Sequence, residues 1–195
     1  MAPRLSAAEK VNILIKINIS TWVKSLGIQD TRASGEQLLY ALGGFLSISL
    51  IFLLSYTVTG LKGAGAILPS MGAAIVLLMA APKAAFSQPW ALFAGNLLSA
   101  IVGVCCYQWI GDSFIAAGSA VGLAMLVMFL CRCLHPPGGA TALAAVVGGD
   151  VIYDLGFYYV LVPTLLNCGI IFVVVFSFHH VIDKYLNANK VKVLT

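Results

Sequence analysis

The stretch Leu134-His135-Pro136-Pro137-Gly138-Gly139-Ala140-Thr141-Ala142-Leu143 opens a short apolar run, Pro136 to Val147. A second short run, Ala64 to Ala81, is also entered through helix breakers, namely Gly63, Gly65, Pro69 and Gly72. A helix of roughly 12 to 18 residues, with a rise of about 1.5 Å per residue, is short for a hydrocarbon core about 30 Å thick. We therefore predict that each short run is a broken crossing or a re-entrant hairpin, with its irregular end inside protein or facing a cavity.

The composition around these runs is that of a membrane protein. Of the 195 residues, 61% are apolar and only 9% are charged, which excludes a water-soluble monomer. Four longer apolar runs are visible: Gln37 to Gly60, Trp90 to Ile110, Phe114 to Cys133 and Phe157 to Ile182. The formal net charge of +4 is predicted to orient the chain in its membrane and not to bind nucleic acid. The predicted fold class is an all-α, polytopic membrane helix bundle.

The chain is predicted to have three parts. Residues 1–36 form a cytoplasmic segment that lacks the apolar core of a secretory signal, so we expect it to remain on the mature protein. Within this segment, Val11 to Leu26 reads as an amphipathic helix, which lies in the headgroup region or packs on the cytoplasmic face of the bundle. Residues 37–182 form the transmembrane domain, and residues 183–195 a cytoplasmic tail.

The charges favour six crossings. If both short runs cross, ten of the eleven Lys and Arg residues fall on one side and Lys62 alone lies opposite, whereas two hairpins would give eight against three. The positive-inside rule therefore favours six crossings with both termini cytoplasmic. We expect this arrangement in the plasma membrane of a bacterium. The acidic residues then expected outside are Asp112, Asp150 and Asp154.

The order long, short, long occurs twice, over residues 37–110 and 114–182, and indicates an internal duplication. Superposing the short runs aligns Pro69-Ser70-Met71-Gly72-Ala73-Ala74 with Pro136-Pro137-Gly138-Gly139-Ala140-Thr141, and brings Asn96 near Asn167. With three crossings in each half, the second half runs opposite to the first. This is the inverted-repeat plan of many transporters, in which interrupted helices mark a substrate site near the midplane.

The starts of the two short helices are the predicted binding site. Each leaves backbone N–H groups without helical partners and carries partial positive charge, so two converging starts would attract a small anion. The alternative is that these prolines and glycines only make tight turns. The predicted substrate-binding residues are Ser70, Met71, Gly72, Asn96, His135, Pro136, Pro137, Gly138, Gly139, Thr141 and Asn167.

Three of these side chains allow two interpretations. His135, with an ordinary pKa near 6.5, would bind an anion when protonated or pass a proton with it, or would be an interfacial residue at a helix start. The amides of Asn96 and Asn167 would donate hydrogen bonds to a substrate, or would bond one helix to another.

The stretch from Leu134 to Leu143 closely resembles the signature of the HPP family of small integral membrane proteins. The segment Pro69 to Ala74, followed by Ala81-Pro82 and Gln88-Pro89-Trp90, resembles the first half of that family. The resemblance covers roughly Leu38 to Ile182. Some members from cyanobacteria and plastids are implicated in nitrite transport, so the resemblance implies transport more firmly than it implies nitrite. The family is commonly described with four spans, and our six crossings depart from that.

The expected function is a transporter or channel for a small inorganic anion, with nitrite as the leading candidate. The alternative is a membrane-embedded sensor or scaffold that binds the anion without moving it. No long span carries an ionisable acid or base near its middle, and no hydrolase motif is present, so we expect neither an enzyme nor a metal or other cofactor. The expected partners are membrane lipid and further copies of the chain, packed through Gly43, Gly44, Gly118 and Gly122.

Overall fold

The computed structural model describes residues 34–194, and every regular element in this range is helical. By its internal packing the chain divides into two units, Met1–Gln37 and Leu38–Thr195. All that follows concerns the second unit. The predicted amphipathic helix from Val11 to Leu26 lies outside the described residues.

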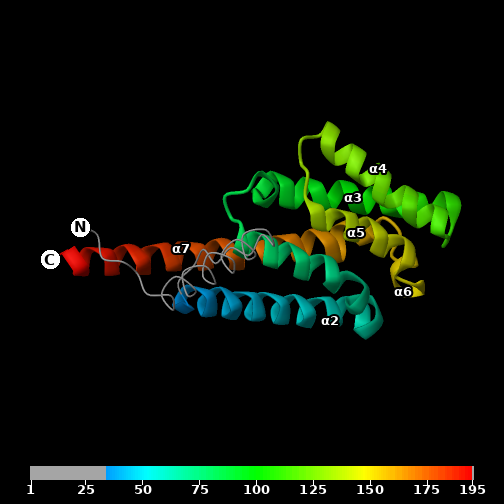
Figure 1. Cartoon of the computed structure of the whole chain (residues 1–195). Coiled ribbons are helices and arrows are strands. Elements are labelled where there is room, and N and C mark those ends of the chain that lie inside the picture. The colour runs from blue at the N-terminus through cyan, green and yellow to red at the C-terminus, as the bar shows by residue number, and fades with distance from the viewer. Residues whose placement is uncertain (1–33, 195) are drawn as a thin grey trace, which may run out of the picture. The chain divides into compact units, whose positions relative to one another are not determined.

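Helix α2 (Ser34–Ala80) consists of two segments that run antiparallel (Figure 1). The chain reverses at Gly60, whose φ of 65° lies in the region that favours glycine. A Cβ added to Gly44 would touch Ile75, and one added to Gly72 would touch Ile48, so the two segments lie side by side. The first long run therefore ends at Gly60, as predicted.

The predicted irregular entry through Gly63, Gly65, Pro69 and Gly72 is wrong, because the second segment of α2 passes through all four residues without ending. Proline has no N–H, so it removes one backbone hydrogen bond from the helix. This loss is tolerated inside a membrane bundle, because groups from neighbouring helices can pair with the freed carbonyl. Here the helix is held on both sides of Pro69 by buried side chains that pack into the main core. These are Ile67, Met71, Ala74, Ile75 and Leu78.

The central helices pack through small residues. A connector that contains the short helix η1 (Ala85–Ser87) leads into α3 (Pro89–Ile110), which is followed by α4 (Phe114–Leu130) and α5 (Pro136–Val147). Prolines begin both α3 and α5, where their missing N–H costs nothing. A Cβ on Gly103 of α3 would overlap the backbone of Ala142 in α5. The absence of a side chain therefore lets these two helices approach closely.

The last long run was predicted to be a single span that begins at Phe157, and the structure differs. After α6 (Asp150–Tyr153) the chain forms the π-helical segment η2 (Val160–Leu165) and then α7 (Leu166–Leu194). Val162 is extended, with φ −131° and ψ 115°, because the ring of Pro163 disfavours helical backbone in the residue before it. The regular part of this run therefore starts after the proline.

Successive helices alternate in direction (Figure 1), which gives the unit two ends. One end, called the Lys83 end, contains the connector 81–88 and the loop 131–135. There Trp90 Nε1, at the start of α3, donates to the Cys131 carbonyl in this loop at 3.2 Å. The other end, called the Asp112 end, contains Gly60 and the loops 111–113 and 148–156. There the rings of Tyr107 and Tyr153 stack with centroids 3.8 Å apart.

This alternation is what six crossings require, although the helices differ in length. Three apolar helices in the described residues are long enough to span a bilayer, in α2, in α3 and over Val160–Lys184. Helices α4 and α5, with 17 and 12 residues, are shorter. At about 1.5 Å per residue, α5 reaches only about 18 Å. Six crossings in two inverted repeats therefore stay a prediction, and labelling can test it.

We expect a cysteine introduced at Lys83 of a cysteine-free variant to stay unlabelled by an impermeant thiol reagent in intact cells. A cysteine at Asp112 should react, because the charge distribution places that end outside. Permeabilised cells, in which both positions should react, are the control. Labelling of position 83 but not of position 112 in intact cells would contradict the predicted orientation.

Candidate functional site

A cluster of polar side chains lies buried where the second segment of α2 meets α3 and α5. Ser70, Asn96 and Thr141, called the polar cluster, are each at most 1% exposed. The Ser70 and Thr141 hydroxyl oxygens are 2.6 Å apart. Thr141 donates to Asn96 Oδ1 at 2.7 Å, and Ser70 donates to the carbonyl of Pro137 at 2.7 Å. The fold thus brings together four predicted site residues from both halves of the chain.

Two further hydrogen bonds connect the polar cluster to groups around it. Asn96 Nδ2 donates to the Leu92 carbonyl at 2.9 Å, and the Tyr159 hydroxyl donates to the Thr141 carbonyl at 2.9 Å. Each hydroxyl of Ser70 and Thr141 has one hydrogen, and a hydroxyl hydrogen rotates to suit its surroundings. The cluster can therefore redirect donors without moving the backbone. Sequence reasoning missed Tyr159, although a buried tyrosine usually requires a hydrogen-bond partner.

The predicted convergence of two helix N-termini is wrong. The second segment of α2 begins after Gly60, about 14 Å of helix before Ser70, because Pro69 does not interrupt it. The start of α5 therefore meets the middle of a helix. In addition, Pro136 and Pro137 carry no N–H, and the N–H of Gly138 donates to the His135 carbonyl at 2.8 Å. The groups that meet at this position are thus mainly side-chain hydroxyls and an amide.

The glycines near the start of α5 have different surroundings. A Cβ on Gly138 would lie 2.8 Å from Ser99 Oγ and 3.0 Å from the Gly95 carbonyl, so this position is needed for packing against α3. Gly139 and Gly72 have room, since their added Cβ atoms would meet nothing nearer than 3.9 Å. Close helix packing, which the sequence reasoning did not consider, accounts for Gly138 without a ligand.

His135 is fully buried in the loop 131–135, against the connector. Its Nδ1 lies 2.9 Å from the Phe86 carbonyl, which can only accept, so Nδ1 carries the hydrogen. Burial lowers the pKa of His135, while the hydrogen bond with Phe86 acts in the opposite direction. The ring is therefore neutral near pH 7. An ordinary, solvated pKa was expected from the sequence, and burial in the loop is the reason for the difference.

Two buried polar atoms beside the start of α5 have no hydrogen-bond partner among the described residues. One is His135 Nε2, which bears a lone pair because the hydrogen is on Nδ1. The other is Ser99 Oγ, which faces Gly138 across the contact between α3 and α5. An unpaired buried polar atom calls for an explanation, and water or an ion is a common one. Ser99 was not predicted, although the spacing Gly95, Ser99, Gly103 marks it as part of a close-packing face.

The remaining predicted residues lie apart from the polar cluster or take no polar part in it. Asn167 at the start of α7 donates from Nδ2 to Ser55 Oγ in the first segment of α2 at 3.0 Å. This bond joins the two halves, as does the bond between Thr141 and Asn96. Met71 packs in the apolar core, and Pro136 is exposed at the entrance to α5.

A bundle of apolar helices with broad exposed apolar faces and polar groups in its interior defines an integral membrane protein. The HPP transmembrane region matches residues 30–186, so the chain belongs to the HPP family. A transmembrane protein of Dictyostelium discoideum is 36% identical over 165 residues, covering 80% of this chain and 53% of that protein.

A second transmembrane protein of the same organism is 34% identical over 128 residues, covering 64% of this chain and 45% of that protein. The chain thus spans about half the length of these curated relatives. No solved structure matches it.

Proposed function

We propose that this protein moves a small inorganic anion across its membrane, with nitrite as the leading candidate, and that the anion passes through the polar cluster. The observation that carries the proposal is the placement of buried hydroxyl and amide groups, with unpaired atoms beside them, inside an apolar bundle. Hydroxyl and amide groups also bond one membrane helix to another, so the unpaired Ser99 Oγ and His135 Nε2 are the part of this observation that points to a ligand.

The chemistry of the polar cluster suits a small monovalent anion. Its donors are hydroxyl and amide groups without formal charge, which bind an anion weakly enough to release it again. The two hydroxyl hydrogens of Ser70 and Thr141 are shared among three contacts, to the Pro137 carbonyl, to Asn96 Oδ1 and to each other. To bind an anion, these hydroxyls would rotate toward it. The alternative, a sensor that binds an anion without transporting it, would use the same donors.

His135 supplies a proton site beside this path. Its free Nε2 accepts a proton and becomes a second N–H donor, and a bound anion stabilises the imidazolium. Since burial lowers the pKa of His135 below its ordinary value near 6.5, protonation and anion uptake together become favourable as the pH falls below that value. Uptake is therefore coupled to protons in this proposal.

Uptake by wild-type proteoliposomes should rise as the pH falls from about 7 to about 5, and the His135→Asn variant should lose most of this dependence. Asparagine does not titrate, and its amide can still donate to the Phe86 carbonyl. His180→Asn, at an exposed position, is the matched control and should keep the wild-type profile. An unchanged profile in His135→Asn would return His135 to a purely structural role.

The decisive experiment for the proposed function measures uptake of nitrite, nitrate, formate and chloride into proteoliposomes of the full chain under imposed pH gradients. Saturable nitrite uptake that exceeds that of empty liposomes is the expected result. Binding of nitrite without uptake would favour the sensor. The bacterial plasma membrane and a homo-oligomeric state stay predictions, which cell fractionation and a detergent-corrected mass can check.

A further inference from the structure

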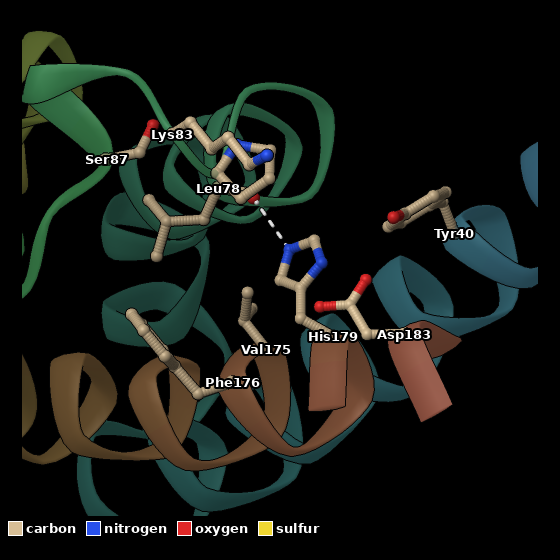
Figure 2. A pocket seen from close by; sticks show the side chains of 9 residues that line it. Tyr40, Leu78, Lys83, Ser87, Val175, Phe176, His179 and Asp183 are labelled. Atoms are coloured by element: carbon tan, nitrogen blue, oxygen red, sulfur yellow. Dashed lines mark hydrogen bonds between the residues drawn. The ribbon is translucent and has the colours of Figure 1, made fainter. Parts of the chain in front are cut away.

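A pocket of about 380 Å³ lies at the Lys83 end, between the connector, α7 and both segments of α2. Lys83 and Ser87 reach it from the connector, and His179 and Asp183 from α7 (Figure 2). Val175 and Phe176 form part of its apolar wall. A water molecule occupies roughly 30 Å³ in the liquid, so the pocket is much larger than nitrite requires.

The pocket carries two opposite charges that do not neutralise each other. Lys83 and Asp183 line it from different elements, and neither forms a salt bridge within the described residues. A ligand with only one charge is attracted by one of them and repelled by the other. A ligand with separated negative and positive groups is complementary to both.

The neutral polar groups of the pocket are also divided between its two sides, with Ser87 on the connector and His179 on α7. The Ser87 hydroxyl lines the pocket next to the Lys83 side, is only 1% exposed and has no hydrogen-bond partner among the described residues. On the α7 side, His179 Nε2 lies 3.1 Å from the Leu78 carbonyl and therefore donates to it. In the neutral tautomer that makes this bond, Nδ1 bears a lone pair. One wall thus offers hydrogen-bond donors, and the opposite wall offers acceptors.

We propose that this pocket binds the headgroup of an ethanolamine phospholipid, with the phosphate on Lys83 and Ser87 and the ammonium on Asp183 and His179. The location fits a lipid, because the pocket is at the end of apolar helices, where headgroups lie. Phe176 is 40% exposed, so the apolar wall continues toward the surface that acyl chains would cover. The site is separate from the polar cluster and does not depend on anion transport.

The test is native mass spectrometry of the delipidated full chain, titrated with phosphatidylethanolamine, phosphatidylcholine and phosphatidylglycerol. Wild type should bind the ethanolamine lipid at least about fivefold more tightly than the other two, since only its ammonium donates to Asp183 and His179. Asp183→Asn should reduce the affinity for the ethanolamine lipid to that for phosphatidylcholine. Lys83→Gln should weaken the binding of all three lipids, because each of them carries the phosphate.

Matched controls are Lys62→Gln and Asp154→Asn, which remove charges at the Asp112 end and should leave the lipid preference unchanged. Equal affinity for the three lipids, or an unchanged preference in Asp183→Asn, would overturn the proposal. Free phosphoethanolamine is added as a competitor in a further arm. Binding of this soluble compound as tightly as the lipid would assign the pocket to a soluble zwitterion and overturn the lipid part.

Discussion

The Gly103→Ala substitution should destabilise the folded protein by about 3 kcal/mol, the upper part of the range for overpacking. The added methyl group would overlap the backbone of Ala142 and lie 2.9 Å from the Ala145 Cβ. A backbone cannot move aside as the end of a flexible side chain can. Helices α3 and α5 would therefore separate along their shared face, and the contact beside Ser99 and Gly138 would loosen with them.

Thermal unfolding of the purified protein in detergent measures this effect. Gly169→Ala in α7 is the matched control, because a Cβ at that position meets nothing within 4 Å. Alanine also favours a helix over glycine by roughly 1 kcal/mol, so the control should be equal to wild type or slightly more stable. Equal midpoints for the two variants would show that α3 and α5 are not packed as described.

The Thr141→Val substitution should reduce nitrite uptake by a factor of about ten or more while leaving the shape of the side chain almost unchanged. Valine cannot donate to Asn96 Oδ1 or approach the Ser70 hydroxyl as a hydrogen-bond partner, and these contacts now measure 2.7 and 2.6 Å. The polar cluster would lose the hydroxyl that connects α3 to α2, and with it a donor for the anion.

The matching variants separate transport from stability. Thr141→Ser keeps the hydroxyl and should retain most of the uptake. Thr57→Val removes a hydroxyl that is exposed and donates only to the Leu54 carbonyl, and should behave as wild type. All rates are compared per folded protein, because leaving Asn96 Oδ1 unpaired costs about 1–3 kcal/mol of stability. Normal uptake by folded Thr141→Val would remove the polar cluster from the proposed path.

Much of the candidate site was predictable because the sequence carries local signals for it. Ser70 and Thr141 lie in the breaker motifs that open the two short runs, and Asn96 is an amide within a long apolar run, so the sequence predicted all three. The double proline at 136 and 137 placed the start of α5 correctly, since a proline is compatible with the first turn of a helix. Asn167 carried the same signal but pairs with Ser55 instead.

The amino-acid sequence alone determined the all-helical class, the end of the first long run at Gly60 and the bounds of α5, because these depend on hydrophobicity and on the backbone limits of glycine and proline. Only the tertiary structure decided that α2 continues through Pro69, that His135 is buried against the connector, and that the start of α5 meets the middle of a helix. Those features depend on which surfaces become neighbours. Packing that holds a helix through a proline, or removes a histidine from water, comes from residues distant in the chain.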